Sequence, residues 1–283
     1  MTPLDRLRRR SAELGAPLCL GVDPHPASLP AGLPPSAQGI ERFARGLIEA
    51  AADQAVAVKI NVAFFEAFGA AGWAALERVR DDVPPDLICL LDAKRGDMGP
   101  TAERYAEALF GHLAADAVTL SPYLGEDAIS PFLAYDDRLV YVLARTSNPS
   151  APTLQALETD GDPLFLHVAR WTAERWPGGR VGLVVGATAP EDLDRARAAV
   201  PGPGFLVPGV GAQAGDLAAA VRACDGLWAP GLVPISRGIA GASAGDDWVA
   251  AASAAARALR RQMRDAVVHS SGVSIGPARR GGS

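Results

Sequence analysis

The sequence predicts a single (β/α)8 barrel, because three features of the chain agree on that fold. Short apolar runs bounded by turn residues recur eight times from one end of the chain to the other. Alanine-rich stretches with helical spacing separate these runs. The chain has 283 residues, a length at which α/β barrels form one domain, and 49% of them are hydrophobic, which suffices for a large core.

The eight predicted strands are continuous apolar runs. They cover residues 18–22, 56–60, 87–91, 117–120, 139–144, 181–185, 205–207 and 232–235. The main predicted helices cover residues 40–52, 65–80, 100–113, 164–176, 190–200 and 217–223. Continuous apolar strands indicate burial on both faces, and alternation with helices indicates parallel strands joined by right-handed crossovers. An open doubly wound sheet has the same pattern, so it is the alternative to a closed barrel.

Two segments fall outside this repeating pattern. Residues 146–163 follow the fifth strand and are rich in Ser, Thr and Pro, which predicts a loop or lid on the catalytic face; a tolerated surface insertion is the alternative. Residues 267–283 show no periodicity and end in a glycine- and arginine-rich stretch. We therefore expect a barrel domain over residues 1–266 and a flexible tail over residues 267–283.

Composition and charge exclude several classes of protein. The formal net charge of −5 argues against broad binding to nucleic acid, which requires a basic face. The sequence contains no run of about 18 apolar residues, so we expect no membrane span. The three cysteines are scattered and have no metal-ligand spacing to the four histidines. This pattern predicts a protein of the reducing cytoplasm without a metal site.

Charged residues follow the first three predicted strands, at the end where a barrel carries its active site. Asp23 follows the first strand, Lys59 lies at the end of the second, and Asp92 and Lys94 follow the third. Asp92 and Lys94 are two residues apart, so on a strand their side chains leave the same face. A structural ion pair would also explain such a pair. The convergence of charges from three strands favours a catalytic site.

Asp97 lies beyond the third strand, so its side chain need not point in the direction of Lys94. Gly99 and Pro100 predict a helix start, which places Thr101 in an exposed first turn beside Asp97. Asp97 therefore either serves a site other than that of its own chain or is simply a favourable charge at a helix N-terminus.

Two segments near the end of the predicted barrel have the features of a phosphate site. The glycine-rich residues 208–215 follow the seventh strand, and Arg237 follows the eighth. Barrels commonly bind phosphate at these positions. Glycines allow backbone N–H groups to approach the anion, and an arginine binds it through two parallel hydrogen bonds. Glycines often serve only in turns, but the nearby arginine favours an anion site.

Over essentially the whole predicted barrel, the sequence resembles the orotidine 5'-phosphate decarboxylase family, particularly its mycobacterial-like (type 2) branch. Residues 92–97, Asp-Ala-Lys-Arg-Gly-Asp, match the family's Asp-x-Lys-x-x-Asp signature. Lys59 stands in the family's position on the second strand, and residues 208–213, Pro-Gly-Val-Gly-Ala-Gln, match its phosphate loop.

The resemblance implies a (β/α)8 barrel that converts orotidine 5'-phosphate to UMP and carbon dioxide, the last step of de novo pyrimidine nucleotide biosynthesis, without a cofactor. It implies that Lys59, Asp92, Lys94 and Asp97 form an alternating network of charges. Asp97 and Thr101 would come from the partner subunit of a homodimer with shared active sites.

The resemblance also implies contacts with the substrate. These are Asp23 with the ribose hydroxyls, Ser147 with the pyrimidine, Gln213 and Arg237 with the phosphate, and further contacts from Lys59 and Thr101. Because Thr146 is adjacent to Ser147, the choice between these two for the pyrimidine is open at this point.

This chemistry explains why a lysine between carboxylates is needed. Loss of carbon dioxide from carbon 6 leaves an electron pair in the plane of the ring, which the ring carbonyls cannot delocalise directly. A cation at that carbon stabilises the carbanion and then protonates it, a role for Lys94. At about 4 Å and an effective dielectric near 20, each carboxylate attracts the lysine by about 4 kcal/mol before desolvation. This attraction favours the charged amine and disfavours an aldolase-like Schiff base.

Two other functions remain as alternatives. Sugar-phosphate decarboxylases and synthases share the Asp-x-Lys-x-x-Asp signature but use magnesium, and Lys59 would repel that ion. A phosphosugar-binding barrel without catalytic activity would need Gln213 and Arg237 but not the charged residues after the third strand. Retention of both sets favours the decarboxylase.

Overall fold

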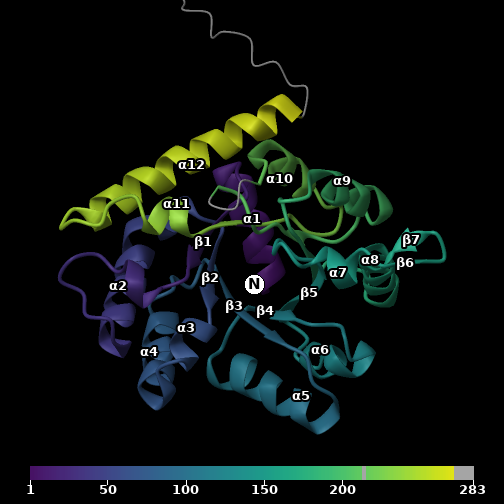
Figure 1. The fold of residues 1–283 in the computed structure, drawn as a ribbon, viewed down its shortest axis with the longest axis horizontal. Helices are drawn as coiled ribbons and strands as arrows, with labels where there is room; N and C mark the ends of the chain where they lie inside the picture. Colours follow the sequence, from purple (N-terminus) through teal and green to yellow (C-terminus); the bar gives the residue numbers. More distant parts are fainter. Residues whose placement is uncertain (212–214, 271–283) are drawn as a thin grey trace, which may run out of the picture.

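Eight parallel strands form the centre of the fold and helices surround them, in a computed structural model that describes residues 1–211 and 215–270 (Figure 1). The strands are β1 Leu18–Val22, β2 Ala57–Asn61, β3 Ile88–Arg95, β4 Ala117–Leu120, β5 Leu139–Arg145, β8 Val181–Val185, β9 Phe205–Leu206 and β10 Val233–Ile235. They pair in the order β10-β1-β2-β3-β4-β5-β8-β9. Each of the eight predicted strands is present.

The ring of strands closes between β9 and the residue before β10. Leu206 forms a parallel bridge with Leu232. The Leu232 N–H donates to the Phe205 carbonyl at 2.7 Å, and the Val207 N–H donates to the Leu232 carbonyl at 2.8 Å. This closure confirms the barrel and rules out the open sheet.

Helices cover the outside of the barrel. They are α1 Pro3–Leu14, α2 Ala37–Ala51, α3 Ala63–Glu66, α4 Gly69–Asp81, α5 Gly99–Ala106, α6 Ser130–Leu133, α7 Pro152–Gln155, α8 Leu164–Arg175, α9 Pro190–Ala199, α10 Leu217–Ala223, α11 Arg237–Ala240 and α12 Trp248–Ser270. A π-helical segment, Glu107–His112, continues α5, and short 3-10 turns lie at Pro26–Ser28, Ala52–Gln54 and Gly125–Ala128.

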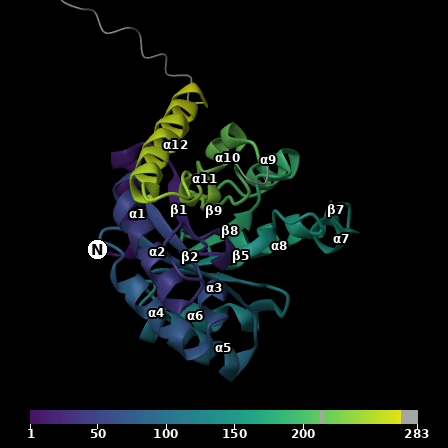
Figure 2. The ribbon, with the colours of Figure 1, turned by 60° about the vertical axis from the view of Figure 1, so that its left-hand side comes forward.

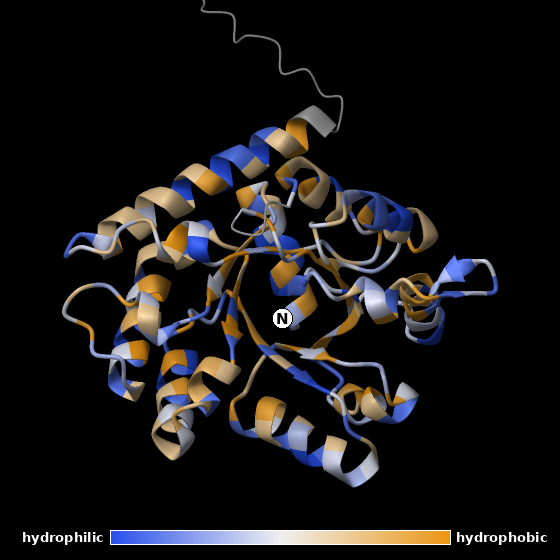
Figure 3. Ribbon diagram, viewed as in Figure 1, coloured by the Kyte–Doolittle hydropathy of each residue, from blue (hydrophilic) through white to orange (hydrophobic). Residues whose placement is uncertain are grey.

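The apolar residues fall into two clusters, one between the strands and the outer helices and one inside the barrel. Figure 3 shows the strands as a largely apolar ring, whereas the outer helices carry both apolar and hydrophilic residues. The inner cluster includes Cys19, Ile88 and Tyr141 from the strands, Leu232 just before β10, and Leu7 of α1. The first helix thus completes the core at the end of the barrel where the strands begin.

Helix α1 was not predicted from the sequence, although its local signals are strong. Thr2 and Asp5 form a capping box, Pro3 occupies the first turn, and Gly15 ends the helix in the left-handed region with φ of 60°. Such a cap contributes about 1 kcal/mol. Helix α1 precedes the first strand, so the strand–helix repeat gave no indication of it.

Helix α12 follows the last strand and completes the strand–helix repeat, but it was not predicted from the sequence. Its first residue, Trp248, packs on Phe43 of α2, with ring centroids 5.2 Å apart. Gly46 is needed at this contact, because a Cβ there would lie 2.3 Å from the Trp248 ring. The predicted boundary between barrel and tail at residue 266 falls within α12, and residues 271–283 lie outside the described residues.

The segment predicted as a lid carries its own structure. It contains α7 and a two-stranded hairpin, β6 Glu158–Thr159 with β7 Asp162–Pro163. Figure 2 shows this segment projecting on the side of the molecule away from the N-terminus. No helix among the described residues is long and apolar enough to span a membrane.

Candidate active site

A cavity of about 530 Å³ lies at the carboxyl ends of the strands. It is lined by Asp23, Lys59, Asp92, Lys94, Thr119, Leu143, Thr146, Ser147, Asn148, Gln155, Val184, Leu206, Pro208, Gly209, Val210, Pro234, Ser236, Arg237 and Gly238. The structure thus brings six of the predicted site residues together, from the ends of β1, β2, β3, β5 and β10: Asp23, Lys59, Asp92, Lys94, Ser147 and Arg237.

Four of these side chains form a continuous row of alternating charge. Lys59 Nζ lies 3.6 Å from Asp23 Oδ1 and 2.9 Å from Asp92 Oδ2. Lys94 Nζ lies 2.6 Å from Asp92 Oδ1. Asp92 is therefore shared between two lysines, one on its own strand and one on the neighbouring strand.

Burial differs along this row. The Lys59 side chain is 8% exposed and that of Asp92 is 11% exposed, whereas the Lys94 side chain is 50% exposed. Burial disfavours the charged Lys59 amine, but Asp92 and Asp23 outweigh burial and raise its pKa. Burial likewise disfavours the ionised Asp92 carboxyl, but the charges of Lys59 and Lys94 and their hydrogen bonds lower its pKa. Lys59 and Asp92 form a fixed buried pair, and Lys94 extends from that pair into the open cavity.

The two residues that could contact a pyrimidine differ in what they already bind. The Thr146 N–H donates to the side chain of Gln155 at 2.8 Å, and the Gln155 amide donates back to the Thr146 hydroxyl at 2.8 Å. The Ser147 carbonyl accepts from the Thr188 hydroxyl, but its N–H and hydroxyl have no partner among the described residues. Of these two residues, Ser147 is thus the one whose N–H and hydroxyl are free to donate to a ligand in the cavity.

The opposite rim of the cavity has the features of an anion site. Gly209 and Gly211 adopt positive φ angles of 103° and 81°, which only glycine adopts readily. The Arg237 guanidinium forms no ion pair with the described residues and lines the cavity. Gln213, the other predicted phosphate contact, lies outside the described residues.

Asp97 and Thr101 do not line the cavity of their own chain, judged on residues 1–211 and 215–270. The Asp97 carboxylate accepts a hydrogen bond from the N–H of Met98 at 2.8 Å, and Thr101 is exposed in the first turn of α5. Met98 is 59% exposed beside them. Within one chain, these predicted site residues stand apart from Lys94.

Four polar residues of the cavity had no role assigned from the sequence: Thr119, Asn148, Gln155 and Ser236. Thr119 is a single hydroxyl in an apolar strand, and Gln155 lies in the lid segment. Asn148 and Ser236 had a sequence signal, because they follow the fifth and the eighth predicted strand. No group of three or more metal-binding side chains occurs among the described residues.

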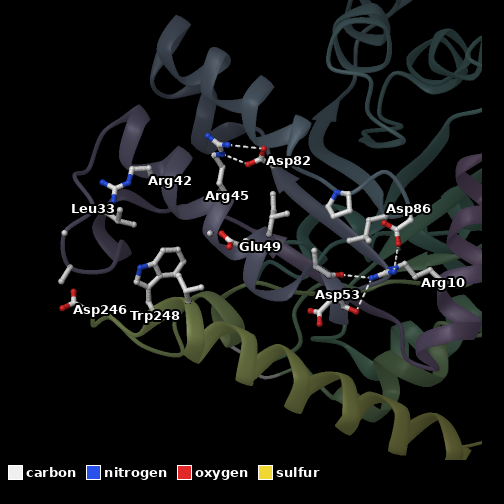
Figure 4. Close-up of a pocket in the computed structure, with 18 residues that line it drawn as sticks. Arg10, Leu33, Arg42, Arg45, Glu49, Asp53, Asp82, Asp86, Asp246 and Trp248 are labelled. Carbon is white, nitrogen blue, oxygen red and sulfur yellow. Dashed lines mark hydrogen bonds and ion pairs between the residues drawn. The ribbon is translucent and has the colours of Figure 1, made fainter.

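A larger cavity, of about 1160 Å³, lies outside the barrel along α2 and the start of α12 (Figure 4). Arg45 pairs there with Asp82, and Arg10 pairs with Asp86. These charges neutralise one another, and the cavity contains none of the strand-end residues of the barrel. Size therefore does not identify the reactive site in this molecule; the chemistry of the lining does.

Comparison with known proteins identifies the family of this chain. The sequence profile of the orotidine 5'-phosphate decarboxylase / HUMPS family matches residues 16–255. The orotidine 5'-phosphate decarboxylase of Roseiflexus castenholzii is 52% identical over 254 residues, which cover 88% of this chain and 91% of that protein.

Two solved structures from Leishmania donovani are also similar. The OMP decarboxylase has a TM-score of 0.82 and 40% identity, over 94% of this chain and 99% of that one. The UMP synthase has a TM-score of 0.84 and 41% identity over 94% of this chain, which spans 57% of the UMP synthase chain. The match covers the whole barrel and its strand-end residues, and the chain therefore belongs to the orotidine 5'-phosphate decarboxylase family.

Proposed function

We propose that this chain is a carboxy-lyase that converts orotidine 5'-phosphate to UMP and carbon dioxide, through Lys94 held by Asp92 and Lys59. The observation that carries this mechanism is the Lys59–Asp92–Lys94 row at the cavity, with a half-exposed lysine at its open end. The reaction itself follows from the family, and it places the chain at the last step of de novo pyrimidine nucleotide biosynthesis.

In this mechanism Lys94 acts on carbon 6 of the pyrimidine. The bond from carbon 6 to the carboxylate breaks, carbon dioxide leaves, and the electron pair stays on carbon 6. The ammonium of Lys94 stabilises that charge and then transfers its proton to carbon 6. Asp92 lies beside the substrate carboxylate and disfavours the bound ground state relative to the carbanion. Lys59 keeps Asp92 ionised throughout.

The remaining residues bind the substrate. Asp23 accepts hydrogen bonds from the ribose hydroxyls, and Lys59 donates to them. The Asp23 Oδ1 atom supports this role, because it is buried and has no hydrogen-bond donor among the described residues. Ser147 binds the pyrimidine edge through its free N–H and hydroxyl. Arg237 and Gln213 bind the phosphate. Binding energy at the phosphate then supports the reaction at the distant carbon.

We further propose a homodimer in which Asp97 and Thr101 complete the partner's active site. The absence of both from the lining of their own chain's cavity supports this assignment, as does the exposed Met98 between them. A carboxylate from the partner would lie on the open side of Lys94 and continue the alternation of charge.

Subunit mixing tests the shared site. Lys94→Ala and Asp97→Ala chains should each be nearly inactive alone. In a hybrid dimer one site carries both substitutions, and the other combines intact Lys94 with intact Asp97. Random pairing of equal amounts makes half the dimers hybrid, so about a quarter of all sites should recover activity. Absence of recovery after demonstrated exchange would assign Asp97 to its own chain.

The decisive test of the function is release of labelled carbon dioxide from carboxyl-labelled orotidine 5'-phosphate. We expect turnover that is unaffected by EDTA. Loss of turnover with EDTA would favour a magnesium-dependent sugar-phosphate enzyme, and no release at all would favour a phosphosugar-binding barrel.

Three assignments accompany this function as proposals. Membership of the mycobacterial-like branch rests on the sequence resemblance. A cytoplasmic location is supported by Cys19, Cys89 and Cys224, which are all free and buried, with burial raising the pKa of each thiol to about 12. Residues 1–266 are proposed as the catalytic domain and residues 267–283 as a tail without a catalytic role.

A further inference from the structure

Thr119 is a buried hydroxyl in the wall of the active site. It lies on β4, where the other three residues are apolar, and it is 1% exposed. A hydroxyl in such a position is stable only if it is hydrogen-bonded, because the strand around it offers no water. Its partners therefore indicate why a threonine is present there.

Both partners of Thr119 belong to the reactive pair on β3. The hydroxyl donates to Asp92 Oδ1 at 2.9 Å and accepts from the backbone N–H of Lys94 at 3.0 Å. The same Asp92 oxygen accepts from Lys94 Nζ at 2.6 Å. One hydroxyl thus contacts the carboxylate that holds the lysine and the backbone that carries it.

The backbone of Lys94 needs this support. Its φ angle is 45°, in the left-handed region that residues with a Cβ seldom adopt. The register between β3 and β4 shifts between Leu91 and Arg95, so Lys94 lies within a bulge. A bulge interrupts the ladder of backbone hydrogen bonds, and the Thr119 hydroxyl takes the place of the missing acceptor for the Lys94 N–H.

We propose that Thr119 is a positioning residue for decarboxylation, whose hydroxyl holds the bulge at Lys94 and the carboxylate of Asp92 in the geometry that points Lys94 Nζ into the cavity. This inference rests on the proposed roles of Asp92 and Lys94. Without the hydroxyl, the Lys94 side chain loses its fixed direction. Since a reacting group must lie in line with carbon 6, a small displacement lowers the rate of the chemical step more than it lowers affinity.

Thr119→Val tests the proposal, because valine keeps the shape of threonine and removes only the hydroxyl. We expect kcat for carbon dioxide release to fall about 10- to 100-fold, while the Kd for UMP stays within about twofold. Thr119→Ser retains the hydroxyl and should recover kcat to within about threefold of wild type. Thr119→Ala removes the same hydroxyl without placing a methyl group against Asp92, and it replaces the valine variant if that variant does not fold.

The chain offers a matched control in Thr172→Val. Thr172 is also fully buried, on α8, and its hydroxyl has no partner among the described residues. Its replacement should leave kcat unchanged. A wild-type kcat in Thr119→Val or Thr119→Ala would overturn the proposal, as would an equal loss in Thr119→Ser. If wild type releases no carbon dioxide, the proposed function fails. If wild type is active and Thr119→Val or Thr119→Ala is equally active, this inference alone fails.

Discussion

The two ends of the barrel use the same charged residue types in opposite ways. At the end where the strands begin, α1 lies across the opening, and its two inward arginines are fully engaged. Arg6 donates to the carbonyls of Pro85 and Leu87 and pairs with Asp116. Arg10 donates to the carbonyls of Ala52 and Ala55 and pairs with Asp86, a pair that Figure 4 shows. Each of these arginines is therefore held by backbone carbonyls and by one carboxylate.

At the end where the strands finish, the charges are arranged around a space. Lys94 is half exposed at one side of the cavity, and Arg237 lines the other without an ion pair among the described residues. Paired charges stabilise the fold, whereas charged side chains that face a cavity without a full set of partners can bind an ionic substrate. We therefore expect substitutions at the end with the cavity to lower activity, and substitutions at the end where the strands begin to lower stability.

The largest effect is expected for Lys94→Ala. Removal of the proton donor should lower kcat by more than about 1,000-fold. Stability should change by less than about 1 kcal/mol, because a half-exposed ion pair contributes little and Asp92 keeps Lys59 as its partner. Carbon dioxide release and urea unfolding measure the two quantities, and UMP binding should persist. Turnover near the wild-type rate would refute the mechanism.

Arg237→Ala should have the next largest effect. Loss of a charged contact to phosphate should reduce kcat/KM by about 100- to 1,000-fold, which corresponds to about 3–4 kcal/mol. Arg222→Ala provides the control, because Arg222 is an exposed arginine at the end of α10 that does not line the active-site cavity. Equal kcat/KM values for the two variants would remove Arg237 from the phosphate site.

The residues at the end of the barrel where the strands finish were easier to predict from the sequence than those at the end where the strands begin. Polar residues after apolar strands stand out, so Asp23, Lys59, Asp92 and Lys94 could be found by position alone. Helix α1 precedes the first strand and belongs to no strand–helix unit, so the strand–helix repeat did not indicate it.

Two features of the site depend on tertiary contacts, which cannot be predicted from a local sequence pattern. Thr119 matters because β4 lies beside the bulge at Lys94, and in sequence it is one hydroxyl in an apolar run. The choice between Thr146 and Ser147 depends on Gln155, nine residues away, which occupies the Thr146 N–H. Closure of the barrel likewise depends on Leu206 and Leu232, which are far apart in sequence.

Asp116→Ala, at the end of the barrel where the strands begin, should lower stability and leave activity nearly unchanged, the opposite of Lys94→Ala. Asp116 is 4% exposed, lies 3.6 Å from Arg138, pairs with Arg6, and accepts the Cys89 N–H at 2.9 Å. Its removal leaves buried donors without partners, and we expect the free energy of unfolding to fall by about 3 kcal/mol. At temperatures where the variant is folded, kcat should stay within about twofold of wild type. A large loss of kcat in folded protein would show that the two ends are coupled.

The smallest expected effect is on the pH dependence of stability, which tests whether Lys59 and Lys94 hold Asp92 in its ionised form. A carboxyl whose pKa in the folded state lies below its ordinary value of 3.8 contributes stability that is fully present above about pH 5. That contribution is lost as the pH falls toward the lowered pKa, because the unfolded chain then binds the proton more readily than the folded one. The difference in urea midpoint between wild type and Asp92→Asn should therefore be constant from pH 7 to pH 5 and shift against wild type below pH 4. A difference that already changes between pH 7 and pH 5 would mean that Asp92 titrates near neutrality and is not held ionised by Lys59 and Lys94.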